Sequence, residues 1–475
     1  MTLSIAIGNA LSGLRTSQQA MDVLSNNIAN ANTPGYTRKT VALESVTVSN
    51  FGRGVQIADI VREVDEYLNA DFRLANSTIE KLRINLQYAE SIEQLYGQPG
   101  ANNSIANTVT DFRSALTALE TAPENQGLRE QALQDGIRLA DRLNTESAAI
   151  QDLRGDAERE IGSIVNRVNS LLDQISDINH QVIRGTAQQQ DVNALKDQRA
   201  NYVNEIATYL DVKVRESADG NLVVTTGIGR TLVDNTVTHP LATTTLTNVN
   251  ASTVFNPITI DGIDVTDELR AGQGQIAAHL DARGTNDLAN PGSLESRQTE
   301  LDRIASALFT NLTSADLATT DTTAGVNDDS NHFFSPYVAA DPITAYNIQV
   351  HPDLVADNSL LNDLAAADDL NVAVNASYTF AAVTNGTSSL TVGFVEYANA
   401  IIEGQALRSS NTELTYKQQE YVTNSLEQRV GQVSGVNIDE ELAQMLQFQK
   451  SFAAAGRLIQ VTSEMLDNLI NIVGR

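Results

Sequence analysis

The hydrophobic pattern at the start of the chain predicts a long amphipathic helix over residues 3–31. Its apolar residues recur at every seventh position: Ile7, Leu14, Met21 and Ile28. The alternate positions of the same stripe are Leu3, Ala10, Ser17 and Leu24. This heptad spacing is that of a coiled-coil seam. The helix is expected to end near Asn32, because Pro34 favours an extended backbone at Thr33.

A second heptad pattern lies at the other end of the chain, in a helix expected over residues 439–473. Its seam residues are Leu442, Met445, Phe452, Ile459, Leu466 and Val473. Such a stripe is also typical of any bundle helix that buries one face within a monomer. Two matched seams favour packing of the first helix on the last, because lone helices of about 30 residues are marginal in water. Polar or small residues interrupt the seams and predict ends that become ordered among neighbouring subunits: Ser17, Gln449, Gly456 and Ser463.

Between the two ends the pattern changes repeatedly between helix and short strand. Thr33-Pro34-Gly35-Tyr36 fits a type II turn, and strands are expected after it over residues 41–48 and 55–61. Helical spacing covers residues 65–96, 104–120, 125–209, 276–280, 294–312 and 394–426. Period-two alternation predicts a hairpin over 212–225 and more strands over 241–265. A glycine-containing break is expected at 431–435.

These elements predict a mainly α protein with β-containing insertions, and a length of 475 residues favours about three domains. The innermost domain is expected to be a terminal α-helical coiled coil with its extended arm, residues 1–62 with 431–475. An elongated helical bundle domain follows, residues 63–314 with 396–430, and holds a β-hairpin element near 211–265. Residues 315–395 are rich in Thr, Asp, Asn and Ala and are expected to form a separate, β-rich outer domain.

Composition excludes several classes of protein. A formal net charge of -28 repels nucleic acid and anionic lipid, so neither is expected as a partner. The chain has no cysteine, so neither a disulfide framework nor a thiolate metal site is predicted. The first residues lack the basic start and apolar run of a secretory signal, and no apolar stretch approaches the roughly 20 residues of a membrane span.

Candidate chemistry is sparse along the sequence. We find no G-x-S-x-G, H-E-x-x-H, P-loop, paired C-x-x-C or EF-hand pattern, so no catalytic, cofactor-binding or metal site is predicted. The five histidines are far apart in sequence, which favours solvated or hydrogen-bonded side chains over metal ligands. Gly227 and Gly229 precede another predicted strand, which favours a tight β turn over a phosphate-binding loop. Acidic pairs such as Asp328-Asp329 and Asp368-Asp369 favour solvated charge.

One run of residues after the first helix resembles the N-terminal signature of flagellar rod, hook and hook-associated axial proteins. The run is Ser25-Asn-Asn-Ile-Ala-Asn-Ala-Asn-Thr-Pro-Gly-Tyr-Thr-Arg38, with its turn at Asn30, Asn32, Thr33, Pro34, Gly35 and Tyr36. Residues 435–442, 446–457 and 464–470 are similar to the C-terminus of the hook-associated members. Two internal segments, 196–199 and 271–283, add to the resemblance, which covers about three quarters of the chain and leaves 315–395 unmatched.

The resemblance implies a non-enzymatic structural subunit at the junction between the hook and the filament, needed for filament attachment and growth. It also implies assembly into a ring, with hook protein on one side and a second junction protein and the filament on the other. Type III export without a cleaved signal, an export chaperone and an extracellular location on the flagellum follow from the same resemblance. The alternatives are a hook or rod axial subunit, or a secreted enzyme or adhesin on flagellar-type terminal helices.

Overall fold

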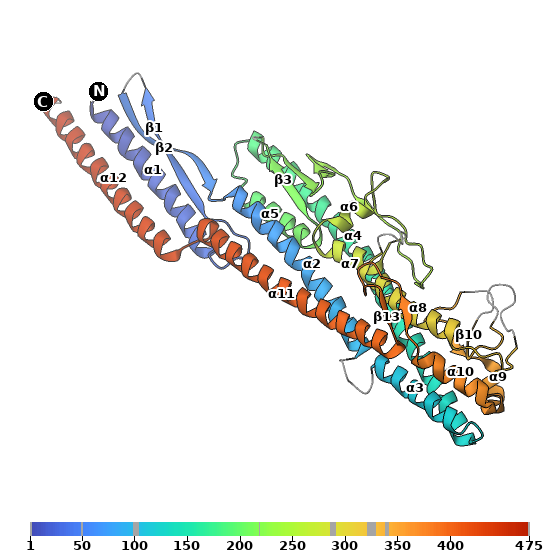
Figure 1. Cartoon of the computed structure of the whole chain (residues 1–475). Helices are drawn as coiled ribbons and strands as arrows, with labels where there is room; N and C mark the ends of the chain where they lie inside the picture. Colours follow the sequence, from blue (N-terminus) through green and yellow to red (C-terminus); the bar gives the residue numbers. More distant parts are fainter. Residues whose placement is uncertain are drawn as a thin grey trace. The chain divides into compact units, whose positions relative to one another are not determined.

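The computed structural model describes residues 2–48, 51–97, 104–217, 219–285, 291–320, 329–337 and 342–473. It is mainly helical with small sheets, which confirms the predicted fold class (Figure 1). The chain divides into two compact units. Unit 1 comprises Met1–Asn76, Asn169–Pro240 and Glu420–Arg475, and unit 2 comprises Ser77–Val168 and Leu241–Gln419. This division differs from the three domains expected, since residues 169–240 belong to the unit of the terminal helices.

The first and last elements of unit 1 are helices. They are α1 (Thr2–Ala29), β1 (Lys39–Val48), β2 (Phe51–Arg62), α5 (Asn193–Tyr209), β3 (Val212–Glu216), β4 (Leu222–Thr226), β5 (Thr231–Asp234), β6 (Val237–Thr238) and α12 (Ile438–Val473). Three long helices contribute residues to both units: α2 (Glu66–Tyr96), α4 (Gln126–Ala187) and α11 (Phe394–Ser434). β1 and β2 form an antiparallel hairpin, and β3 to β6 form an antiparallel sheet in chain order.

The hairpin of β1 and β2 is longer than the sequence predicts. The two strands pair up to Val48 and Phe51, and Gly52 and Gly54, which fall between the two predicted strands, lie within β2. Gly54 has a φ of 105°, and a Cβ there would collide with the Ser12 side chain on α1. Glycine at this position therefore lets the bulged strand approach α1, where the Val55 amide donates to the Ser12 hydroxyl at 3.2 Å.

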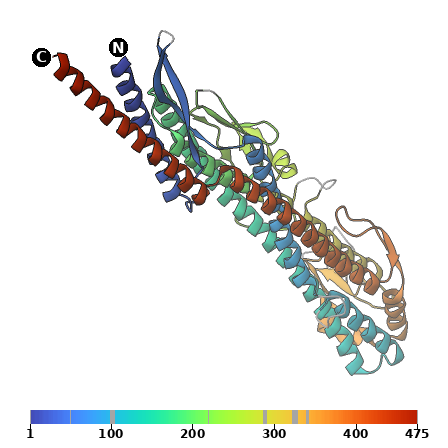
Figure 2. The same ribbon diagram turned by 90° about the vertical axis from the view of Figure 1, so that its left-hand side faces the viewer.

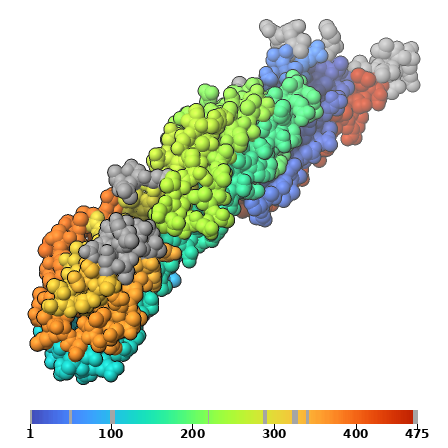
Figure 3. Space-filling view, turned by 90° about the vertical axis from the view of Figure 1, so that its right-hand side faces the viewer, coloured from blue at the N-terminus to red at the C-terminus, as the bar shows by residue number. Residues whose placement is uncertain are grey.

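The remaining elements belong to unit 2. They are α3 (Ile105–Thr121), β7 (Leu241–Ala242), β8 (Thr259–Ile260), β9 (Ile263–Asp264), α6 (Thr266–Ala271), α7 (Gln275–Arg283), α8 (Ser293–Asn311), β10 (Phe334–Pro336), β11 (Ile348–Val350), α9 (Pro352–Ala356), the 3₁₀ helix η1 (Asn358–Asn362), α10 (Leu364–Asn375), β12 (Tyr378–Phe380) and β13 (Leu390–Val392). A single apolar core joins residues of α3, α4, α8, α10 and α11. The space-filling view shows the surface of residues 342–400, in orange, next to that of α3 and the start of α4, in cyan (Figure 3).

The described part of 315–395 contains more helix than strand, contrary to the β-rich expectation. Residues 364–375 form α10 because they are rich in alanine and leucine and because the Asp363 carboxylate caps the first turn, accepting from the Ala365 amide at 2.7 Å. α10 packs on α3, and its buried residues Ala366, Leu370 and Val374 belong to the common core. In the described residues this region is thus part of unit 2.

Candidate functional site

The two terminal helices α1 and α12 lie side by side in both views of the ribbon (Figures 1 and 2). The heptad of α1 has two columns of side chains, and the column with the smaller ones is buried at Ala10, Ser17 and Leu24. The column with the larger side chains is only half-buried: Ile7, Leu14, Met21 and Ile28. α1 packs on both α12 and β2, and the column with the smaller side chains is the one it buries.

The predicted seam of α12 divides between two faces of the helix. Met445, Phe452 and Ile459 are half-buried, whereas Leu442 and Leu466 are exposed; the side chain of Val473 lies outside the described residues. Four more large apolar side chains are exposed between Leu442 and Leu466: Leu446, Leu458, Val461 and Met465. The exposed fraction is 57% for Leu446 and 53% for Met465, which is high for side chains of this size. We call these four residues with Leu442 the outer face of α12.

The signature turn follows α1 and has a defined hydrogen-bonding geometry. The Tyr36 amide donates to the Thr33 carbonyl at 3.1 Å and Gly35 has a φ of 74°, as a type II turn requires of its third residue. The Asn30 side chain donates to the Asn26 side chain at 2.7 Å and accepts from the Thr33 hydroxyl at 3.2 Å. A Cβ at position 35 would collide with the side chain of Asn201, so glycine is needed there for space as well as for φ. Asn32 and Pro34 are exposed.

Asn27, at the end of α1, joins the turn to the last helix. Its side-chain carbonyl accepts from the Tyr36 hydroxyl at 2.9 Å and from the Lys39 amide at 3.1 Å. Its amide group donates to the Lys39 carbonyl and to the Glu441 carboxylate, both at 2.8 Å. Asn27 is fully buried, and these four bonds satisfy all of its side-chain hydrogen-bonding capacity. We call Asn27, Tyr36, Arg38, Lys39 and Glu441 the Asn27 network.

Arg38 connects the signature turn to both C-terminal helices. Its Nε donates to the buried Glu441 carboxylate at 2.7 Å, and an Nη donates to Glu440 at 2.8 Å. Its backbone amide donates to the carbonyl of Ser434, the last residue of α11, at 2.8 Å. This bond satisfies a carbonyl that the end of the helix leaves free. α11 therefore continues through Gly431 to Ser434, and the break expected at 431–435 is shorter than predicted.

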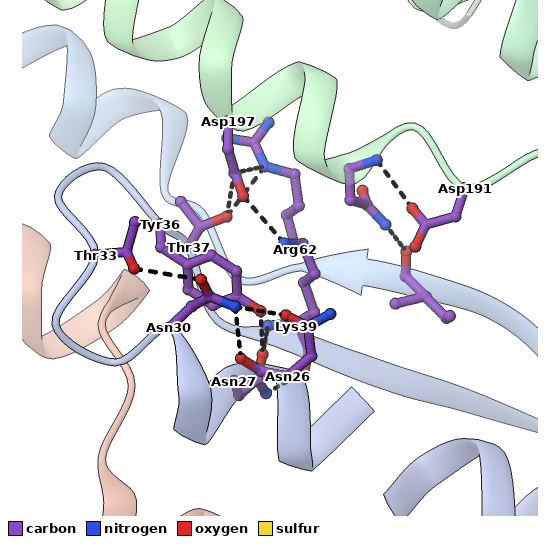
Figure 4. A network of polar contacts seen from close by, with 12 residues as sticks. Asn26, Asn27, Asn30, Thr33, Tyr36, Thr37, Lys39, Arg62, Asp191 and Asp197 are labelled. Atoms are coloured by element: carbon purple, nitrogen blue, oxygen red, sulfur yellow. Dashed lines mark hydrogen bonds and ion pairs between the residues drawn. The ribbon is translucent and has the colours of Figure 1, made fainter. Parts of the chain in front are cut away.

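Asp197 of α5 binds several side chains that follow the signature turn (Figure 4). Its carboxylate accepts from the Thr37 hydroxyl at 2.5 Å and from Nε of Arg62 at 2.7 Å, and Nζ of Lys39 lies 3.2 Å away. The Lys39 ammonium also lies 4.0 Å from the centre of the Tyr36 ring. All of these side chains are at least half-buried, so the interactions are strengthened by the low local dielectric.

The charges around the turn keep the Tyr36 phenol and the Arg38 guanidinium protonated, so both remain hydrogen-bond donors. Burial, together with the negative charges of Asp197, Glu441 and Asp191, raises the pKa of Tyr36 to about 12. Burial by itself lowers the pKa of Arg38, but hydrogen bonding to Glu440 and the charge of Glu441 raise that pKa overall. The phenol therefore remains a hydrogen-bond donor and Arg38 remains a cation at neutral pH.

The sequence prediction of the site did not include the buried polar residues that hold it: Asn27, Arg38, Asp197 and Glu441. All four lie in segments that resemble the axial proteins, 25–38, 196–199 and 435–442. Asn27 and Glu441 are 414 positions apart, so no local spacing relates them. Among the described residues, no helix is long and apolar enough to cross a membrane and no group of three or more potential metal ligands is found.

The two ends of the chain that pair through this turn match family models of flagellar axial proteins. The family model of the flagellar basal body rod protein matches residues 7–37, and that of the rod FlgEFG protein C-terminus matches residues 429–472. Between these ends, the model of the flagellar hook-associated protein FlgK helical domain matches residues 89–327. The chain belongs to the FlgK family of flagellar hook-associated proteins.

Individual relatives agree with this family. Flagellar hook-associated protein 1 of Bacillus subtilis is 23% identical over 99% of this chain and 98% of its own length. The protein of the same name from Escherichia coli is 24% identical over 99% of this chain and all of its own length. A structure of the flagellar hook junction protein FlgK from Burkholderia pseudomallei matches with a TM-score of 0.44 and 20% identity, covering 57% of this chain and 47% of that one. The predicted structural role at the hook–filament junction is confirmed at the level of the family.

Proposed function

We propose that this chain joins the hook to the filament through its paired terminal helices, which pack among those of neighbouring axial subunits. The observation that supports this is the outer face of α12, whose large apolar side chains are exposed on the single chain. Large exposed apolar side chains along one helix mark a surface that another protein covers. Covering one half-exposed leucine contributes roughly 1 kcal/mol, so the five residues together contribute several kcal/mol for each subunit.

The rest of the proposal concerns partners and location. The subunits form a ring, with hook protein below and a second junction protein and the filament above. The chain reaches this place on the extracellular flagellum by type III export, with an export chaperone that covers the apolar ends beforehand. It makes and breaks no covalent bond. A net charge of -28 makes subunits repel one another, so incorporation is expected to increase with ionic strength.

The proposal is tested first by deleting the gene and examining the cells by electron microscopy, with a blot for flagellin in the medium. Hooks without filaments, with flagellin lost to the medium, are the expected result. Absent hooks would instead support the alternative of a rod or hook subunit, since the ends of the chain also match rod-protein family models. Normal filaments would contradict both roles.

The outer face of α12 is tested by a double variant, Leu446→Gln with Leu458→Gln. The α1–α12 pair should still form, because both residues are exposed on the single chain, while filament attachment is lost. Leu407→Gln is the matched control, since Leu407 is an exposed leucine on another helix. Normal filaments in the double variant would contradict the assigned surface, while leaving the junction role to be judged by the deletion strain.

A further inference from the structure

A small cavity in unit 1 is lined mainly by basic side chains. Its volume is about 40 Å³, and residues of α2, α5, β3 and the end of β2 form its walls. The basic residues of the lining are Arg62, Arg73, Lys196 and Arg199. The acidic ones are Glu66 and Glu216. The proposed junction role does not require this cavity.

Three of the four basic side chains have carboxylate partners. Arg62 pairs with Asp197 at 2.7 Å. Glu216 is shared, since one of its oxygens lies 2.9 Å from Lys196 and the other lies 2.9 Å from Arg199. The carboxylates of Asp197 and Glu216 are thus both occupied by cations other than Arg73.

Arg73 forms an ion pair with neither of these two carboxylates. Its exposed fraction is 8%, and in the described part of the chain its Nε is a buried donor with no hydrogen-bond partner. Burial lowers the pKa of Arg73, and the charge of the exposed Glu66 opposes this without a hydrogen bond between the two. A guanidinium does not lose its proton in proteins, so Arg73 keeps its charge. Burying this charge away from water costs free energy, and a bound anion would compensate for that cost.

We propose that this cavity is a binding site for a small inorganic oxyanion of the phosphate type, held by Arg73. A guanidinium presents two parallel donors that match two oxygens of an oxyanion. A water needs roughly 10–15 Å³ by the same measure of volume, so the cavity has room for two or three oxygen atoms. Lys196 and Glu216 are 26% and 27% exposed, so the remaining oxygens can face solvent between them.

The test is hydrogen exchange of the full chain, read on peptides of unit 1, in increasing inorganic phosphate at constant ionic strength maintained with chloride. Phosphate at ten times its dissociation constant should shift the unfolding equilibrium of unit 1 about 11-fold toward the folded state. Arg73→Met should fold and lose this dependence, because methionine fills a similar space without charge. Arg215→Met is the matched control and should retain it, since Arg215 is exposed and points away from its neighbours Val214 and Glu216, which line the cavity.

Two results would overturn the proposal. One is a wild-type chain whose unfolding does not depend on phosphate, which decides the matter even if Arg73→Met fails to fold. The other is a wild-type chain whose stability increases with protein concentration in the absence of phosphate, while the stability of Arg73→Met does not depend on protein concentration. That result would mean that a carboxylate of a second copy, and not a free oxyanion, neutralises Arg73.

Discussion

Glu441→Gln is the substitution that most directly tests the Asn27 network, because it removes the charge and changes the shape of the side chain very little. Glu441 is fully buried and accepts from Nε of Arg38 at 2.7 Å and from the amide of Asn27 at 2.8 Å. If the oxygen of the introduced amide faces Arg38, its NH₂ group faces the NH₂ group of Asn27. Turning Asn27 around would break its bonds from Tyr36 and Lys39. No arrangement therefore satisfies every buried group.

The magnitude follows from these contacts. A buried donor left without an acceptor costs about 1–3 kcal/mol. Loss of the charge opposite Arg38 adds to this, but Glu440 remains 2.8 Å from the same guanidinium and compensates in part. We therefore expect Glu441→Gln to lower the free energy of unfolding of unit 1 by about 2–4 kcal/mol. Glu440→Gln is the control and should cost less than about 1 kcal/mol, because the Glu440 side chain is 50% exposed.

The assay is hydrogen exchange of the full chain, read on peptides that cover residues 25–42 and 436–446. Exchange distinguishes unit 1 from unit 2, which a single denaturation midpoint does not do for a chain of two units. A double-mutant cycle with Asn27→Asp should give a coupling energy of at least about 1 kcal/mol, because the new carboxylate accepts from the new amide. Equal protection in Glu441→Gln and Glu440→Gln would refute the reasoning, since burial of the network is its basis.

Three further predictions concern other positions. Asp197→Asn should lower the stability of unit 1 by about 3–5 kcal/mol, measured by exchange of the β1 and β2 amides, because Lys39 and Arg62 lose a buried counter-charge. Gly456→Ala should stabilise α12 by about 1 kcal/mol, since a Cβ there meets nothing within 4 Å, whereas Gly435→Ala should destabilise the end of α11 by collision with the Gly431 carbonyl. Burial raises the pKa of Glu146 to about 7, so this carboxyl binds more protons in the folded state than in the unfolded state near neutrality; it should contribute about 0.8 kcal/mol more to the stability of unit 2 at pH 6.5 than at pH 8, and Glu146→Gln should remove this contribution, measured by hydrogen exchange of unit 2 peptides.

Periodicity predicted which segments form the terminal helices but not which side of each helix is buried. The heptad of α1 has two columns, and a sequence favours the one with the larger side chains, Leu14 and Met21. The structure buries Ser17 and Leu24 of the other column instead. The choice depends on how closely α12 approaches, and that distance is set by side chains on both helices together.

Local rules were less successful where the deciding partner is distant in sequence. Gly431 predicts a helix break, yet α11 continues to Ser434, whose carbonyl is satisfied by the Arg38 amide almost 400 positions earlier. The same holds for Asn27, which an isolated helix would expose to solvent. Resemblance to a family located these segments, because it compares whole runs of residues and does not depend on contacts being near in sequence.

The polar and apolar parts of the terminal helices have different consequences for assembly. Apolar burial is non-directional, so the outer face of α12 can drive association but tolerates a sliding of one helix along another. The Asn27 network tolerates no such shift, because displacing α12 by one turn would leave the buried Glu441 carboxylate without its donors Arg38 and Asn27, and the Asn27 amide group with one donor unpaired. Buried polar groups of this kind fix the register of helix pairs. The network therefore sets the position of α12 on α1, and that position determines which apolar side chains remain on the outer face for a neighbouring subunit.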